Sequence, residues 1–278
     1  MCLIQNFAIL GGDRRQYFLA GQLIADGFSV ACCQVPGLPD THTGLAGALA
    51  HAEAVLLPMP ALDDAAHLRG SGIRVEDVRQ SIVPGTRVFG GILPDGLFPA
   101  GVQFDYARDE SLAVQNAALT AEGAVALALQ SMPSGLAGTP VLVIGFGRIG
   151  KLLSRKLQAL GALVTVSSRK TRDQGWCAAL GYGAERTGLY AAGLSQYGCV
   201  FNTVPAPVFS AEQLAAIRCP ILDLASAPGG LSTGAEPPAN YSRALGLPAK
   251  FAPAQAARIL KTTIFRMLSE EQEALWNP

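Results

Sequence analysis

A glycine motif in the second half of the chain, Gly145-Phe146-Gly147-Arg148-Ile149-Gly150, follows an apolar run and precedes an amphipathic segment. The run Val141–Ile144 is typical of a buried strand. Residues 148–160, followed by Gly161, are typical of a helix that ends at a glycine. A strand, a GxGxxG turn and a helix in this order predict a dinucleotide-binding unit, with a purely structural glycine turn as the alternative.

Each glycine of the motif has its own expected role. Gly145 permits a tight turn, Gly147 lets the backbone approach a pyrophosphate, and Gly150 lets the helix pack close to the sheet. The phosphates are expected at the start of the helix, at Arg148 and Ile149, because unpaired N–H groups and the helix dipole favour negative charge there.

The turn after the next expected strand, 163–167, indicates which dinucleotide binds. An NAD-specific site places an acidic residue there, on the ribose 2′-hydroxyl. Here Ser168, Arg169 and Lys170 occupy this place, and two cations with a hydroxyl suit a 2′-phosphate better than a free diol. The sequence therefore predicts NADP as the cofactor, with an ordinary solvated basic turn as the alternative.

Composition excludes several classes of function. Lys and Arg total 21, as do Asp and Glu, so the chain lacks the basic field that nucleic-acid binding needs. We find no apolar run near the roughly 20 residues of a membrane span and no signal-like N-terminus, so we expect a cytoplasmic protein without a membrane partner. Six cysteines without a CxxC pair predict reduced thiols and no structural metal.

Strand, turn and helix alternate in both halves of the chain. This alternation predicts an α/β protein of two doubly wound Rossmann-like domains with parallel sheets and an interdomain cleft. We expect an N-terminal α/β domain on the substrate side (1–110) and an NADP-binding Rossmann domain (111–278). In the latter, helix 111–132 would link the domains, and helix 254–276 would pack back on the N-terminal domain. The remaining expected strands are 7–10, 28–33, 54–57, 87–89, 102–105, 199–204 and 221–225.

The histidines His42, His51 and His67 all lie in the first quarter of the chain. A 2-hydroxyacid dehydrogenase usually takes its catalytic histidine from a later part of the chain, so this distribution argues against that reaction. HExxH and GxSxG motifs are absent from the sequence, so hydrolysis has little support.

Arg14 and Arg15 follow the turn Gly11-Gly12 and precede a helix for which Asp13 is the expected N-cap. The helix dipole disfavours cations in a first turn, and a bound anion would remove that conflict. Because arginine pairs with carboxylates through two hydrogen bonds, both are candidates for binding an acidic substrate. The alternative is that both point into solvent.

Asn116, Thr120 and Glu122 cluster on the expected linking helix, where Asn116 and Thr120, four apart, share one face. Glu122 stands among small apolar residues, where a carboxylate needs a partner or has a raised pKa that suits a proton acceptor. Exposure on the helix surface is the alternative.

Polar residues also follow two expected strands of the second half. Asn202, Thr203 and Val204 follow one strand, and Ser226 follows the other, at the edge of the sheet where ligands gather. We expect the first three to contact the cofactor and Ser226 to orient substrate or nicotinamide. Lys250, in an expected loop before the last helix, is a candidate for a substrate carboxylate or a solvated side chain.

The chain resembles the dipicolinate synthase A subunit family over nearly its whole length. Seven segments show the resemblance: GGDRRQ (11–16), FGGI (89–92), NAALTAEGAVALALQ (116–130), GFGRIG (145–150), FNTVP (201–205), DLASAPGG (223–230) and LGLPAKFAPAQAARIL (245–260).

The resemblance implies NADP-dependent oxidation of a dihydrodipicolinate-type intermediate of the lysine pathway to dipicolinate during sporulation, in the mother cell. It also implies that the partner is a flavoprotein-like B subunit, and we expect a homo-oligomer as well. In this interpretation Arg14 and Arg15 hold carboxylates, and Thr120 and Glu122 line the ring or accept a proton. The family's Pro-Lys motif near the last helix is Pro253-Ala254 here.

Two other functions stay open on the sequence, and a third is disfavoured. A non-catalytic NADP-binding sensor or scaffold would need the same glycine motif, as would another two-domain NADP-dependent dehydrogenase of small carboxylic acids. A glycine-motif methyltransferase predicts an acidic residue after the second strand, where this chain has Arg169 and Lys170.

Overall fold

The computed structural model divides the chain into two compact units. Unit 1 comprises residues 1–116 and 252–278, and unit 2 comprises residues 117–251. Cys2 and His42 lie outside the described residues. The structure describes every residue except 1–3, 42–43, 99–101, 191–192 and 277–278.

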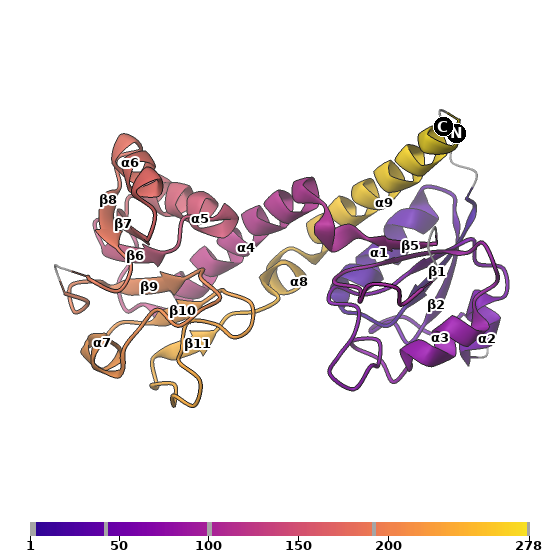
Figure 1. Cartoon of the computed structure of the whole chain (residues 1–278), viewed down its shortest axis with the longest axis horizontal. Helices are drawn as coiled ribbons and strands as arrows, with labels where there is room; N and C mark the ends of the chain where they lie inside the picture. The colour runs from indigo at the N-terminus through magenta and orange to yellow at the C-terminus, as the bar shows by residue number, and fades with distance from the viewer. Residues whose placement is uncertain (1–3, 42–43, 99–101, 191–192, 277–278) are drawn as a thin grey trace. The chain divides into compact units, whose positions relative to one another are not determined.

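Unit 1 is built on a parallel sheet (Figure 1). The strands follow the order β2-β1-β3-β4-β5. In sheets of this flavodoxin-like order, ligands commonly bind where the strand order reverses, which here is between β1 and β3. The strands are β1 (Asn6–Leu10), β2 (Ser29–Cys33), β3 (Ala54–Leu56), β4 (Arg87–Gly90) and β5 (Gln103–Asp105). The helices assigned wholly to this unit are α1 (Arg14–Ala25), α2 (Gly44–Leu49), α3 (Val75–Ser81), the 3-10 turn η1 (Tyr106–Arg108) and α9 (Pro253–Trp276).

Burial explains why these apolar runs form central strands. Every residue of β3 is at most 1% exposed, as expected of a parallel strand covered on both faces. Phe7 of β1 packs against Phe28 and against Phe265 of α9, with ring centroids 5.3 and 6.0 Å apart. Helix α9 packs along α1, and Lys261 Nζ lies 2.5 Å from Asp26 Oδ2.

Unit 2 is built on a parallel sheet with the order β11-β10-β9-β6-β7-β8, which is the Rossmann order read from one edge. The prediction of two parallel-sheet α/β domains is therefore confirmed. The strands are β6 (Pro140–Ile144), β7 (Leu163–Ser168), β8 (Gly183–Arg186), β9 (Cys199–Asn202), β10 (Ile221–Asp223) and β11 (Tyr241–Arg243). The helices are α4 (Glu110–Ser131, which begins in unit 1), α5 (Arg148–Ala159), α6 (Thr171–Ala179), α7 (Ala211–Ala216) and α8 (Leu247–Phe251).

Helix α4 is long and apolar enough to cross a membrane by length and composition, so the expectation of no such run is wrong for this segment. Its small residues serve packing in unit 2. Ala121, Ala124 and Ala128 are fully buried in the core. A Cβ on Gly123 would lie 2.8 Å from Leu247 Cβ, so the missing side chain allows α8 to approach.

Several elements of unit 2 differ from the sequence expectations. The strands expected over 199–204 and 221–225 end earlier, at Asn202 and Asp223, because the next residues turn to form loop contacts. Lys250 lies on the short helix α8 rather than in a loop. Strand β8 was not expected, since it is short and its residues are exposed or half-buried at the edge of the sheet.

We predict that Leu157→Ala destabilises unit 2 by about 2–5 kcal/mol, because it removes a fully buried side chain of α5 from the core. Leu160→Ala, three residues on, is the matched control, because Leu160 is 48% exposed. Urea unfolding followed by circular dichroism measures both, and the control should change by no more than about 0.5 kcal/mol. Equal losses in the two variants would contradict this view of the core.

Candidate functional site

The glycine turn lies at the carboxyl end of β6. Gly145 has a φ of 98°, and a Cβ there would overlap the Thr203 hydroxyl oxygen. A Cβ on Gly150 would overlap the Gly145 carbonyl oxygen, so Gly150 permits a close approach within the turn as well as between helix and sheet. Gly147 differs, because nothing lies within 4 Å of a Cβ built on it. This open side is where a phosphate group could approach the backbone.

The start of α5 suits an anion. Gly147 is the N-cap residue and has no side chain to accept the N–H groups of the first turn, which begins at Arg148 and Ile149. The helix dipole adds positive potential at this end. A bound phosphate would therefore accept the hydrogen bonds of these N–H groups, which a capping side chain accepts in other helices.

The turn lies beside the topological switch point of the sheet, between β6 and β9. Ile144 of β6 pairs in register with Asn202 of β9. Both the backbone N–H and the hydroxyl of Thr203 donate to the Ile144 carbonyl oxygen, at 2.9 and 2.8 Å. In open α/β sheets ligands bind at such a point, outside the carboxyl ends of the strands.

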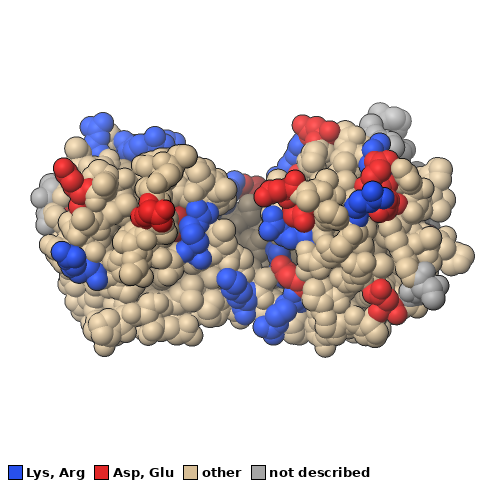
Figure 2. Space-filling model, turned by 90° about the horizontal axis from the view of Figure 1, so that it is seen from below, with Lys and Arg blue, Asp and Glu red and all other residues tan. Residues whose placement is uncertain are grey.

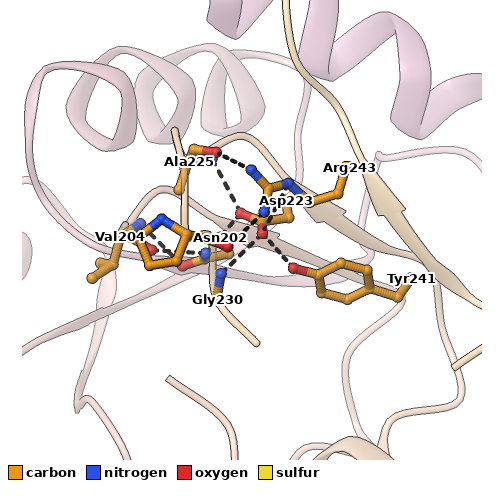
Figure 3. A network of polar contacts seen from close by, with 8 residues as sticks. Asn202, Val204, Asp223, Ala225, Gly230, Tyr241 and Arg243 are labelled. Atoms are coloured by element: carbon orange, nitrogen blue, oxygen red, sulfur yellow. Dashed lines mark hydrogen bonds and ion pairs between the residues drawn. The ribbon is translucent and has the colours of Figure 1, made fainter. Parts of the chain in front are cut away.

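Asn202 is fully buried, and its side chain contacts protein atoms (Figure 3). Its Nδ2 donates to the Val204 carbonyl oxygen at 3.0 Å and to Asp223 Oδ1 at 2.8 Å, and its Oδ1 accepts from the Val204 N–H at 3.0 Å. Asn202 therefore shapes the loop that holds Thr203 and Val204, both half-buried.

The predicted 2′-phosphate turn follows β7 at the same edge. Ser168 is 4% exposed and donates to the Lys170 carbonyl oxygen at 3.3 Å, so its hydroxyl shapes the turn. Arg169 and Lys170 are exposed. Arg186, an exposed residue of β8, pairs in register with Ser168 and adds a third cation to this edge, which the sequence reasoning missed because β8 itself was not expected.

Asp13 is the N-cap of α1, which confirms the prediction, and it forms a capping box with Gln16. Arg15 is 7% exposed, so the alternative that both arginines point into solvent is wrong for Arg15; Arg14 is exposed. Arg15 Nη2 donates to Asp13 Oδ2 at 2.8 Å and to the Met59 carbonyl oxygen at 2.6 Å. Asp13 follows β1 and Met59 follows β3, so Arg15 bridges the switch point of unit 1.

The charge of Arg15 dominates the electrostatics of this turn. Burial acts to raise the pKa of Asp13, but the hydrogen bonds and positive charge of Arg15 outweigh it, and the pKa of Asp13 is lowered. The ion pair is thus a fixed part of the turn near neutral pH.

The candidate residues of α4 are not alike. Asn116 and Thr120 are half-buried and lie on one face of the helix, as expected. Glu122 is 53% exposed, and Lys156 Nζ of α5 donates to its Oε1 at 2.9 Å, so the carboxylate has a partner and the alternative of exposure on the helix surface holds. The helical period explains this exposure, because Ala121 and Ala124 take the core-facing positions.

Ser226 and Lys250 are both exposed. Ser226 begins the turn that Gly229 closes by donating to the Ser226 carbonyl oxygen at 2.9 Å. Unit 2 thus brings the glycine turn, residues 202–204 and Ser226 to one edge of its sheet. Arg14 and Arg15 lie at the corresponding edge of unit 1, and their meeting with the residues of unit 2 stays a prediction.

Charge on the visible surface of each unit is scattered. Figure 2 shows most of this face in tan, with acidic and basic side chains interspersed on it. Among the described residues, no group of three or more His, Cys, Asp or Glu side chains is arranged to hold a metal ion.

Comparisons with known proteins agree with this arrangement. Residues 6–100 match the family model for the N-terminal domain of the dipicolinate synthase A subunit. The chain is 30% identical over 171 residues to the dipicolinate synthase A subunit of Bacillus subtilis, a match that spans 60% of this chain and 57% of that protein.

Two solved structures share the fold over almost the full chain. The dipicolinate synthase A subunit from Bacillus halodurans superposes with a TM-score of 0.79 at 25% identity, covering 96% of this chain and 99% of that one. A transhydrogenase from Sinorhizobium meliloti reaches 0.65 at 16% identity, covering 94% and 92%. The chain is therefore similar to dipicolinate synthase A subunits, in sequence over part of its length and in fold over almost all of it, and its residues 6–100 match the model of their N-terminal domain.

Proposed function

We propose that the chain is an NADP-dependent oxidoreductase that converts a dihydrodipicolinate-type intermediate of the lysine pathway to dipicolinate. The observation that carries the proposal is the glycine turn at the switch point of a Rossmann sheet, with Arg169 and Lys170 exposed at the end of the neighbouring strand. The relatives named dipicolinate synthase support the choice of substrate.

The residues present fit this cofactor. Gly147 leaves room for a pyrophosphate, and the start of α5 favours its charge. The exposed Arg169 and Lys170 offer two cations for a 2′-phosphate, on a turn that the buried hydroxyl of Ser168 shapes. When bound, NADP supplies a hydride acceptor. The substrate ring loses a hydride from one carbon and a proton from another position, so two electrons leave it and it becomes aromatic.

The remaining task of the protein is to hold the ring and take the proton. Arg14 is the exposed cation at the unit 1 turn and is proposed to bind a substrate carboxylate, while Arg15 holds the turn and adds positive charge. Thr120, Glu122 and Ser226 are the proposed groups near the ring. Glu122 would leave its ion pair with Lys156 and accept the proton that the substrate ring loses.

Further proposals concern binding and location. Asn116 and Lys250 are further proposed contacts of the substrate. The backbone at Arg148, Ile149 and residues 202–204 is proposed to contact the cofactor. We propose a cytoplasmic protein of the sporulating mother cell. The proposed partners are further copies of this chain and a B subunit.

A non-catalytic NADP-binding scaffold is the second candidate, because the same glycine turn would serve it. Formation of NADPH by the isolated chain, with dihydrodipicolinate-type substrate, distinguishes the two. NADP binding without turnover, alone or with the B subunit, would favour the scaffold.

We predict tighter binding of NADP than of NAD, and a loss of this preference in the Arg169→Ala/Lys170→Ala double variant. Removing two charge-assisted contacts should weaken NADP binding by about tenfold or more, or about 1.4 kcal/mol, with little effect on NAD. Calorimetric titration measures both affinities. Arg218→Ala, an exposed arginine in the segment before β10, is the control. Equal affinities for the two dinucleotides in the unaltered protein would contradict the choice of NADP.

We predict that two glycine substitutions in one turn affect different properties, one the stability of the protein and the other its binding of dinucleotide. Gly150→Ala should cost about 1–3 kcal/mol of stability, because its Cβ overlaps the Gly145 carbonyl oxygen. Gly147→Ala should change stability by no more than about 1 kcal/mol but weaken dinucleotide binding about tenfold, because the methyl group occupies the open side. Thermal unfolding and calorimetry measure the two effects. Unchanged binding in Gly147→Ala would remove the pyrophosphate from this position.

We predict that Arg14→Ala raises KM for the dicarboxylate by about tenfold, because one carboxylate loses its cation. Steady-state NADPH formation gives KM and kcat. Arg79→Ala is the control, since Arg79 is an exposed residue of unit 1 that pairs with Glu76 on α3. If KM stays unchanged in Arg14→Ala, Arg14 is not part of the substrate site.

A further inference from the structure

The fully buried carboxylate of Asp223 accepts hydrogen bonds from several parts of unit 2 (Figure 3). Its Oδ1 accepts from Asn202 Nδ2 at 2.8 Å and from the Ala225 N–H at 3.1 Å. Its Oδ2 accepts from the Gly230 N–H at 2.9 Å and from the Tyr241 hydroxyl. A carboxylate offers about four lone-pair positions, so these donors fill it.

The strand register explains how these side chains meet. Asn202 of β9 pairs with Asp223 of β10, and Asp223 pairs with Arg243 of β11. Residues paired in a parallel register point to the same face of a sheet, so the three side chains form a row. Tyr241, two residues before Arg243, points to that face as well.

Arg243 holds the loop after β10 from its other side. Its Nη1 donates to the Pro228 carbonyl oxygen at 2.7 Å and its Nη2 to the Ala225 carbonyl oxygen at 3.3 Å. Its Nε lies 3.7 Å from Asp223 Oδ2. The loop 225–230 is thus fixed at its start, middle and end.

Two consecutive glycines let the loop backbone lie directly on this cluster. Gly229 has a φ of 86°, and a Cβ there would overlap Arg243 Nη1. A Cβ on Gly230 would lie 2.5 Å from Asn202 Nδ2. Residues 226–228 of the same loop are exposed. Gly229 and Gly230 therefore pack against the buried side chains, and the exposed residues 226–228 are accessible to a ligand.

The cluster also reaches the glycine turn. Asp223 accepts a hydrogen bond from the side-chain amide of Asn202. The same amide donates to the carbonyl oxygen of Val204 and accepts from its N–H. A Cβ on Gly145 would lie 2.8 Å from Val204 Cγ2, so the position of Val204 limits the shape of the turn.

We propose that Asp223 is a positioning residue that, with Tyr241 and Arg243, holds the loop 225–230 and the turn at Val204 in the arrangement that binds the dinucleotide. The inference rests on the proposed function and deepens it, because it assigns a role in cofactor binding to a side chain that is buried behind the surface. Burying a charged group costs desolvation energy, so the fixed geometry of this cluster is a better guide to its role than any gain in stability.

The substitution Asp223→Asn tests this with almost no change in shape. An amide has only one acceptor oxygen, so its NH₂ group would face either the Gly230 N–H and Tyr241 hydroxyl or the Asn202 and Ala225 donors. Tyr241→Phe is a milder variant that removes a single donor. Glu212→Gln, on the exposed start of α7, removes the same charge elsewhere in unit 2 and is the control.

The first measurement is hydrogen exchange in the ligand-free protein. Protection of the Ala225 and Gly230 amides should fall by about tenfold or more in Asp223→Asn, less in Tyr241→Phe and not in Glu212→Gln. Unchanged protection in Asp223→Asn would overturn the inference, whatever the protein binds. Should Asp223→Asn not fold, Tyr241→Phe decides the point by the same comparison.

The second measurement is NADP titration of the same variants. We expect Kd to rise about tenfold in Asp223→Asn and less in Tyr241→Phe, with Glu212→Gln unchanged. Loss of amide protection with an unchanged Kd would leave Asp223 a structural residue and overturn its positioning role. An unaltered protein that binds neither NADP nor NAD would overturn the proposed function, while the exchange data still report whether Asp223 holds the loop.

Discussion

The parallel register of the unit 2 sheet is the constraint on which its candidate site depends. Because the strands run in one direction, the residues that end them gather at one edge, and Ile144, Asn202, Asp223 and Arg243 stand in one row across four strands. A one-residue slip would turn every side chain of a strand to the opposite face. The buried apolar residues that precede the strand ends of β6, β9 and β10 oppose that slip, so the core of the unit also fixes its polar edge.

Much of this could be predicted from the sequence because it depends on local chemistry. The glycine turn needs Gly145 at a positive φ, and Asp13 caps a helix by contacting residues close to it in the chain. Both features can therefore be predicted from short sequence segments. The parallel sheets follow from apolar runs with turn residues between them. The interdomain arrangement of the predicted site residues stays a prediction.

The remaining parts depend on contacts between distant segments. The sequence left open whether Glu122 has a partner or is exposed, and its partner, Lys156, comes from another helix 34 residues away. Arg186 and Arg243 were missed because β8 and β11 are short edge strands without an apolar run. The sequence shows Asp223 beside its loop, but the donors that fill its carboxylate come from Asn202 and Tyr241, which only the fold brings near.

Each unit holds a buried charge near the point where its strand order reverses, at that point in unit 1 and one strand beyond it, on β10, in unit 2. In unit 1 a buried cation, Arg15, is fixed by Asp13 and a backbone carbonyl, whereas in unit 2 a buried anion, Asp223, is fixed by N–H and O–H donors beside Arg243. An apolar replacement of a buried pair often leaves stability unchanged, so burial of these charges is not by itself evidence that they stabilise the fold. Each leaves a more exposed neighbour, Arg14 or Ser226, on a rigid support. A rigid support of this kind reduces the conformational entropy that is lost when a ligand binds. This gain can offset the desolvation energy that burying a charge requires.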